Sequence, residues 1–154
     1  MTAFPPIEEL LSHRDNMLLL KEVVAFSETG VTCRSIPDAG AWYVLGENGN
    51  MPAWIGIELM AQAIASHVAL LSIHEGRKPR PGALLGTRAY QASQPLFPAG
   101  ESLTVRAHET CRTADGLASY DCALLSPAGD QLASAALTVY EPEDFEQFIL
   151  GKQN

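Results

Sequence analysis

The chain has 154 residues, of which 47% are hydrophobic and 18% are charged, and its formal net charge is −8. This length and composition are typical of a single globular domain, residues 1–154, rather than of a disordered chain. The acidic excess argues against nucleic acid as a partner, because phosphate binding needs a basic surface.

The N-terminal third is predicted to hold a short helix and a β-hairpin. The helix covers residues 7–11, behind two prolines, and has glutamates in its first turn, where the helix dipole favours negative charge. Residues 17–26 predict a strand, and residues 31–36, which alternate apolar and polar side chains, predict its partner across a turn. A loop follows at residues 37–50. No basic region precedes an apolar one, so we expect no signal peptide and a cytoplasmic protein.

Residues 53–72 predict a long helix that is apolar on nearly every side. Such a helix must be wrapped by other structure or lie in a membrane. Gln62, Ser66 and His67 interrupt it, so no window reaches the roughly 18 apolar residues of a membrane span. We therefore expect a helix buried inside a soluble domain. Its carboxylate, Glu58, is the first candidate for chemistry, because an unpaired buried charge is strongly disfavoured.

The C-terminal half is predicted to form four further strands. They follow a basic, proline-rich linker and precede a short terminal helix in the tail; the strands cover residues 83–95, 102–112, 117–126 and 131–140. This order predicts an α+β protein in which a curled antiparallel sheet of about six strands wraps the long central helix, the hot-dog arrangement. Such a sheet has edge strands, and pairing across a twofold axis protects them, so we expect a homodimer.

The three cysteines, Cys33, Cys111 and Cys122, are scattered along the chain. They form neither a CxxC pair nor a Cys/His metal spacing, so we expect no disulfide framework, no metal and no cofactor. We expect all three to be buried apolar side chains of a reduced protein.

Three segments resemble motifs of the 3-hydroxyacyl-acyl-carrier-protein dehydratases. They are LLSHRDNMLLLKEVV at residues 10–24, MPAWIGIELMAQ at residues 51–62, and LLGTRAYQASQPLFPAGESLTVRAHE at residues 84–109. The segments occur in the family's order and cover most of the chain. Within this superfamily the chain is most similar to the shorter dehydratase-like proteins encoded in aryl-polyene clusters. The resemblance implies a hot-dog fold and a role in fatty-acid or polyene biosynthesis.

The chain departs from this family where the usual catalytic histidine should be. In the family that histidine lies seven positions before the Met of an MPG motif, and counting back from Met51 gives Val44. No histidine occurs anywhere in residues 14–66. The carboxylate and the glutamine of the motif are kept, as Glu58 and Gln62.

The resemblance implies that the kept residues dehydrate a 3-hydroxyacyl thioester. This reaction removes a proton from C2 and protonates the departing hydroxyl at C3. The family gives the acid role to the carboxyl, here Glu58, and enclosure favours the protonated form that an acid needs. Gln62, one helical turn on, would orient a water or the hydroxyl. Substrate binding is implied for the residues around the start of the central helix, whose N–H groups would hold the thioester oxygen: Tyr43, Met51, Pro52, Ala53 and Trp54.

Without the usual histidine, three interpretations stay open. In the first, the chain is a dehydratase that uses Glu58 alone, with water or Tyr43 as helper. In the second, it is an acyl thioesterase with Glu58 as base or nucleophile. In the third, it is a non-catalytic or half-catalytic subunit that lends Glu58 to a related hot-dog partner, so both a homodimer and a heterodimer are open. In each case the ligand would be a thioester of acyl carrier protein or of coenzyme A.

The other histidines are expected to have structural or surface roles. We expect His13 to pack the first helix onto the sheet, since its family counterpart is not catalytic. His67 and His74 lie toward the far end of the central helix and are expected at the surface or the helix terminus. His108 alternates within a strand and is also expected to be exposed.

A short basic span follows the central helix. It contains Arg77, Lys78, Arg80 and Arg88, four of the ten basic residues of the chain. This span is either a solvated linker that complements the C-terminal end of the helix, or a docking surface for an acidic carrier protein and its phosphate.

Overall fold

The computed structural model describes residues 4–11, 13, 15–44, 49–77 and 82–141. Its elements, in chain order, are α1 (Ile7–Leu10), a 3₁₀ turn (Asp15–Met17), β1 (Glu22–Ser27), β2 (Gly30–Ser35), β3 (Met51–Pro52), α2 (Ile55–His74), β4 (Ala83–Ala92), β5 (Leu96–Phe97), β6 (Leu103–Arg112), β7 (Leu117–Leu125) and β8 (Gln131–Tyr140).

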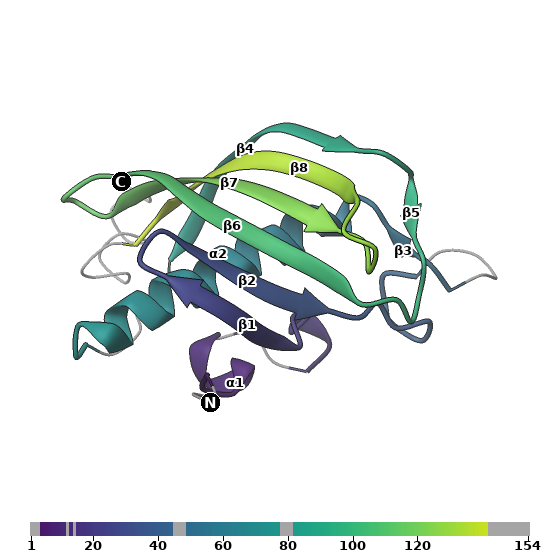
Figure 1. The fold of residues 1–154 in the computed structure, drawn as a ribbon, viewed down its shortest axis with the longest axis horizontal. Coiled ribbons are helices and arrows are strands. Elements are labelled where there is room, and N and C mark those ends of the chain that lie inside the picture. Colours follow the sequence, from purple (N-terminus) through teal and green to yellow (C-terminus); the bar gives the residue numbers. More distant parts are fainter. Residues whose placement is uncertain (1–3, 12, 14, 45–48, 78–81, 142–154) are drawn as a thin grey trace, which may run out of the picture.

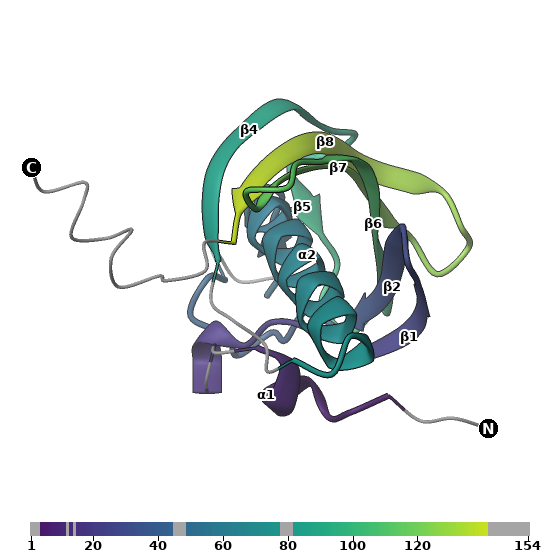
Figure 2. The ribbon, with the colours of Figure 1, turned by 90° about the vertical axis from the view of Figure 1, so that its left-hand side faces the viewer.

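Six strands form one antiparallel sheet in the order β1-β2-β6-β7-β8-β4. The sheet curls around α2, which runs along its concave face (Figures 1 and 2). The predicted α+β hot-dog arrangement is therefore confirmed. Strands β1 and β4 are the two edges of the described sheet.

The core lies between α2 and the inner face of the sheet. Side chains alternate between buried and more exposed positions along β7 and β8, as expected for strands with one covered face. By length and composition α2 would suffice to cross a membrane, but 72% of its most apolar window is buried inside the fold. Gly56 permits close packing at the start of the helix, since a Cβ there would clash with the Tyr90 hydroxyl.

Two local features differ from the sequence prediction. The first strand begins at Glu22 rather than at residue 17, because the preceding residues form a 3₁₀ turn and an extended segment. The short strands β3 and β5, which pair Met51 with Phe97, were not predicted. The predicted terminal helix and most of the basic linker fall at residues 142–154 and 78–81, outside the described residues.

Candidate functional site

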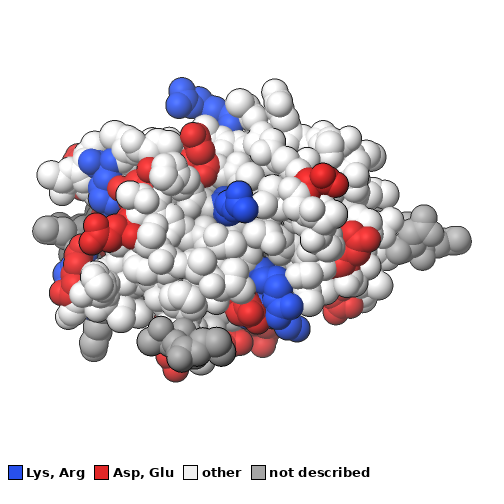
Figure 3. All heavy atoms as spheres, viewed as in Figure 1, with Lys and Arg blue, Asp and Glu red and all other residues white. Residues whose placement is uncertain are grey.

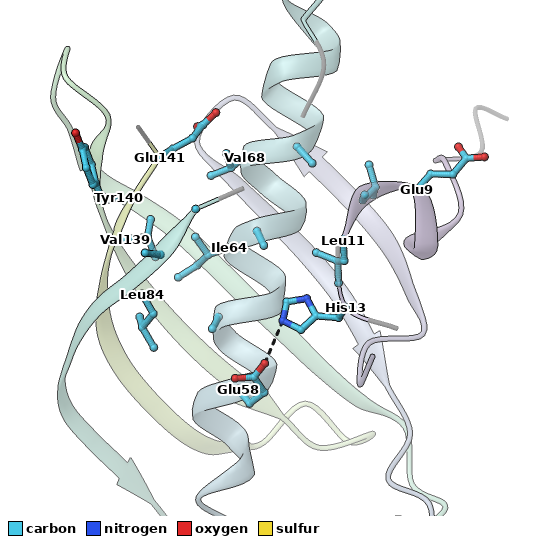
Figure 4. Close-up of a pocket in the computed structure, with 16 residues that line it drawn as sticks. Glu9, Leu11, His13, Glu58, Ile64, Val68, Leu84, Val139, Tyr140 and Glu141 are labelled. Carbon is cyan, nitrogen blue, oxygen red and sulfur yellow. Dashed lines mark ion pairs between the residues drawn. The ribbon is translucent and has the colours of Figure 1, made fainter. Parts of the chain in front are cut away.

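A pocket of about 570 Å³ opens beside α2 (Figure 4). The N-terminal segment forms one wall and the start of β4 with the end of β8 forms the other. Apolar side chains dominate the lining: the residues are Glu9, Leu10, Leu11, His13, Glu58, Ala61, Ile64, Ala65, Val68, Ala69, Gly82, Ala83, Leu84, Val139, Tyr140 and Glu141. The alanines on the helix leave room for a long apolar group to lie along it.

Glu58 stands at one end of this pocket, in the first turn of α2. Its Oε1 receives a hydrogen bond from Gln62 Nε2 at 3.1 Å and lies 3.4 Å from His13 Nε2, an ion-pair distance. Within the described residues, Oε2 makes no hydrogen bond or ion pair. The side chain is 38% exposed, so this chain alone does not provide the enclosure expected for Glu58.

Gln62 is fully buried and uses its whole amide group. The amide oxygen accepts the backbone N–H groups of Leu19 and Leu20, at 3.0 and 3.3 Å. The amide nitrogen donates to the Met17 carbonyl at 2.8 Å and to Glu58. Gln62 therefore fastens the N-terminal segment to α2 and orients the carboxylate one turn earlier. In this arrangement it has no hydrogen left to offer a substrate.

His13 was not selected by the sequence as a site residue, yet the structure places it against Glu58 on the pocket wall. The two residues are 45 positions apart, so no local spacing links them. The contact depends on the Gln62 bonds that bring the N-terminal segment to the helix. A signal was present only indirectly, because the segments that carry His13 and Glu58 both belong to the dehydratase-like motifs.

Four of the five predicted substrate-binding residues directly precede α2, and none of the five lines this pocket. Met51, Pro52 and Ala53 are buried, whereas the Trp54 side chain is exposed. Tyr43 is buried, and its hydroxyl accepts a hydrogen bond from the backbone N–H of Asp38. Substrate binding by these residues stays a prediction.

The predicted docking residues are only partly within the described structure. Arg77 follows the C-terminal end of α2 and pairs with Glu75 at 2.5 Å. Arg88 is an exposed residue of β4. Lys78 and Arg80 lie outside the described residues. On the face shown in Figure 3, basic side chains are scattered among acidic ones and form no continuous patch of described residues.

His67, predicted at the surface or the helix terminus, is fully buried and belongs to a second polar network. Its Nε2 lies 3.0 Å from the Ser27 carbonyl, which can only accept, so Nε2 carries the hydrogen. Neutral Nδ1 then accepts the Tyr120 hydroxyl at 2.6 Å, and Tyr120 accepts a bond from Arg112 at 3.1 Å. The prediction failed because one polar residue in an apolar helix does not reveal its partners on distant strands.

Cysteine chemistry does not add to the site. Burial raises the pKa of the Cys33 and Cys122 thiols to about 12, so neither forms the reactive thiolate near neutral pH. Both are buried, as predicted, whereas Cys111 is exposed and that prediction was wrong.

The model of one protein family, the ApeP-like family described as ApeP dehydratase, matches residues 5–150. No curated protein matches the chain. Among solved structures, the chain is similar to one in the dehydratase heterocomplex ApeI:P from Xenorhabdus doucetiae. The TM-score is 0.86 and the identity 25%, and the match covers 96% of this chain and 97% of that one.

More distant structures share the fold. A hypothetical thioesterase with coenzyme A from Streptococcus pneumoniae aligns with a TM-score of 0.61 and 14% identity over 78% of this chain and 84% of that one. The PaaI protein from the phenylacetic acid degradation operon of E. coli aligns with a TM-score of 0.60 and 12% identity over 78% of each chain. At these identities the likeness concerns the fold alone.

Proposed function

The chain belongs to the ApeP-like dehydratase family, and from this premise we propose that it is one subunit of a 3-hydroxyacyl-thioester dehydratase, a heterodimer with a related hot-dog protein. In this proposal Glu58 is the acid of the reaction and the pocket beside α2 holds the acyl chain. The pathway would be fatty-acid or polyene biosynthesis.

The observation that carries this proposal is that Oε2 of Glu58, at the end of an apolar pocket, has no hydrogen-bond or ion-pair partner among the described residues. A thioester substrate has a long apolar tail and a polar reacting end. The lining formed by Ile64, Val68 and Leu84 suits the tail, and the carboxyl of Glu58 stands where the polar end would lie. Burial of the tail would provide binding energy of about 0.8 kcal/mol for each methylene group.

The chemistry assigned to Glu58 is the protonation of the leaving group. A base takes the C2 proton, and the electron pair of that C–H bond forms the C2=C3 double bond. The C3–O bond breaks, and the hydroxyl leaves as water with the proton from Oε2. The base then gives up its proton and Glu58 regains one, so both groups return to their starting state. Since the family's histidine is missing here, the base is assigned to the partner subunit.

A partner is supported by two features of the isolated chain. Glu58 is more than a third exposed, although an acid of this kind works best when water is excluded. Strand β4, an edge of the sheet close to the pocket, exposes Leu84 and Leu85. An edge strand that has exposed leucines and no further neighbour in the described sheet is a surface that another strand can cover. The similar heterocomplex ApeI:P makes a related hot-dog subunit the partner we propose.

We propose that acyl carrier protein carries the acyl thioester, with coenzyme A as the alternative carrier. Arg88 is exposed on β4, and Arg77 lies at the C-terminal end of α2, where its charge is already shared with Glu75. These guanidinium groups, with Lys78 and Arg80, would attract an acidic carrier protein and its phosphate despite the acidic charge of the whole chain.

The test is an assay of the products. The chain alone, and the chain purified with its hot-dog partner, are incubated with 3-hydroxyacyl thioesters and with saturated acyl thioesters. We expect an α,β-unsaturated thioester from the 3-hydroxy substrate, formed by the complex and not by the chain alone. Free thiol without unsaturation would make the protein a thioesterase. Retained acyl-thioester binding with no product from the complex would make it a non-catalytic subunit.

A further inference from the structure

We propose that His13 is a positioning residue of the reaction, which acts through Glu58. It holds Oε1 so that Oε2 is the oxygen that reacts, and it stabilises the carboxylate that forms when Oε2 gives up its proton. This inference rests on the proposed function, and it assigns a task to a residue that the family motif leaves without one.

The first step concerns which oxygen of Glu58 carries the proton. The amide orientation of Gln62 is fixed, because its oxygen accepts two backbone N–H groups, those of Leu19 and Leu20. Its nitrogen is therefore the atom that faces Glu58 Oε1, and it must donate. In the protonated acid, Oε1 is thus the carbonyl oxygen and the acidic hydrogen sits on Oε2.

The second step concerns the hydrogen on His13. Oε1 is an acceptor, so the Nε2 of His13 that lies 3.4 Å away presents its N–H to it. This distance is long for a hydrogen bond, and such contacts tighten when the reacting complex forms. His13 and Gln62 are both directed at Oε1, so among the described residues only Oε2 is left for the substrate. Figure 4 shows the His13 contact.

The third step concerns charge. Negative charge develops on Glu58 as the proton moves from Oε2 to the departing hydroxyl. Two donors directed at Oε1 face this charge, and the His13 contact tightens as the charge develops, which lowers the barrier more than it strengthens substrate binding. Loss of His13 should therefore lower kcat and leave KM nearly unchanged. The other titratable groups of the lining, Glu9, Tyr140 and Glu141, lie toward the opposite end of the pocket in Figure 4.

The experiment compares two substitutions of His13 in the complex of the chain with its partner. His13→Gln keeps an N–H donor at nearly the place of Nε2, whereas His13→Leu keeps the bulk and removes the donor. We expect kcat for a 3-hydroxyacyl thioester to fall about 10- to 100-fold in His13→Leu and by less than about threefold in His13→Gln. In both variants KM should stay within about twofold of the wild-type value.

A double mutant separates action through Glu58 from action on its own. In a Glu58→Gln background, His13→Leu should cause no further loss, because the residue it serves is already absent. Three outcomes would overturn the inference: full kcat in His13→Leu, equal losses in the two His13 variants, or a rise in KM at constant kcat. Each of these, together with an inactive Glu58→Gln, leaves the proposed function standing. A wild-type complex without dehydration, or an active Glu58→Gln variant, removes the proposed function, and the inference fails with it.

Discussion

Two polar networks lie on α2, one near its start and one in its C-terminal half. Each interrupts an apolar helix in the sequence, but the two differ in structure. Near the start of α2, Glu58 contacts both Gln62 and His13; nine positions after Glu58, His67 contacts Tyr120. Around His67 both ring nitrogens have partners and the side chain is fully buried. Around Glu58 one carboxylate oxygen has no partner within the described residues, and the side chain is 38% exposed beside a pocket.

The difference separates a structural network from a reactive one. A buried polar group costs free energy unless its hydrogen bonds are made, so a network that is closed and satisfied serves the fold. A network that stops with an open oxygen at an apolar pocket leaves that oxygen for something that enters the pocket. The Glu58 and His67 networks thus differ in whether all their hydrogen bonds are made, and not in the type of residue.

The largest effect expected is on activity, from Glu58→Gln. The amide can still accept the Gln62 bond at one atom, but it cannot supply a proton. We expect kcat/KM for dehydration to fall at least about 1,000-fold, or about 4 kcal/mol of transition-state stabilisation. The melting temperature should stay within about 2 °C of the wild-type value, which differential scanning calorimetry would measure.

Glu9→Gln is the matched control, because Glu9 lines the opposite end of the same pocket. It should retain activity close to that of the wild-type protein. Equal activity in Glu58→Gln and Glu9→Gln would mean that the open oxygen has no role in turnover.

At His67 we expect the opposite result, a loss of stability without a loss of activity. His67→Leu leaves the Ser27 carbonyl and the Tyr120 hydroxyl without their partner inside the core. We expect the free energy of unfolding to fall by about 2–4 kcal/mol, measured by urea denaturation. His67→Gln, which can still form one of the bonds, should lose less. The folded fraction of both variants should keep its kcat, and a selective loss of kcat would place His67 in the reaction.

Much of the fold could be predicted from the sequence because its signals are local. The alternation along residues 31–36 and the length of the apolar run at residues 53–72 each indicate an element from neighbouring residues alone. The two-residue strands β3 and β5 carry no such pattern, since each exists only through pairing with the other. The first strand was predicted too early because an apolar run cannot show that Gln62 takes the backbone hydrogen bonds of Leu19 and Leu20.

The candidate site was predictable only in part, for a related reason. A single carboxylate on an apolar helix is visible in the sequence, and Glu58 was selected on that ground. Its contact with His13 depends on tertiary packing between residues 45 positions apart. The burial of His67 depends in the same way on a strand tyrosine, Tyr120. The positions of His13 and His67 both depend on partners far away in the sequence, and no local sequence pattern reveals either position.

A smaller effect is expected from narrowing the pocket at Ala65, which lines it between the two networks. In Ala65→Leu the longer side chain would occupy space assigned to the acyl tail. We expect KM for long-chain 3-hydroxyacyl thioesters to rise about tenfold, or about 1.4 kcal/mol, and KM for short-chain substrates to stay unchanged. Leu is nearly as good a helix former as Ala, so stability should be preserved. An equal change for all chain lengths would place the acyl tail elsewhere.

The smallest effect expected is on the pH dependence of stability, and it comes from His67. Burial lowers the pKa of His67 from its ordinary value of 6.5, while the nearby Glu109 and Arg112 oppose each other. Below pH 6.5 the unfolded chain therefore binds a proton that the folded chain resists. The contribution of His67 to the free energy of unfolding is therefore fully present above pH 6.5 and decreases as the pH falls below 6.5. The slope cannot exceed about 1.4 kcal/mol per pH unit for one proton.

His67→Gln isolates this contribution, because it removes the titrating ring and leaves the other ionisable groups in place. Urea unfolding of both proteins between about pH 7.5 and 5.5 would give the stability advantage of the wild-type protein at each pH. We expect that advantage to shrink as the pH falls. An advantage that is constant over the range would show that His67 takes up a proton as readily in the folded chain as in the unfolded one. The hydrogen bonds of His67 would then not keep it neutral, and the contrast between the His67 and Glu58 networks would lose its physical basis.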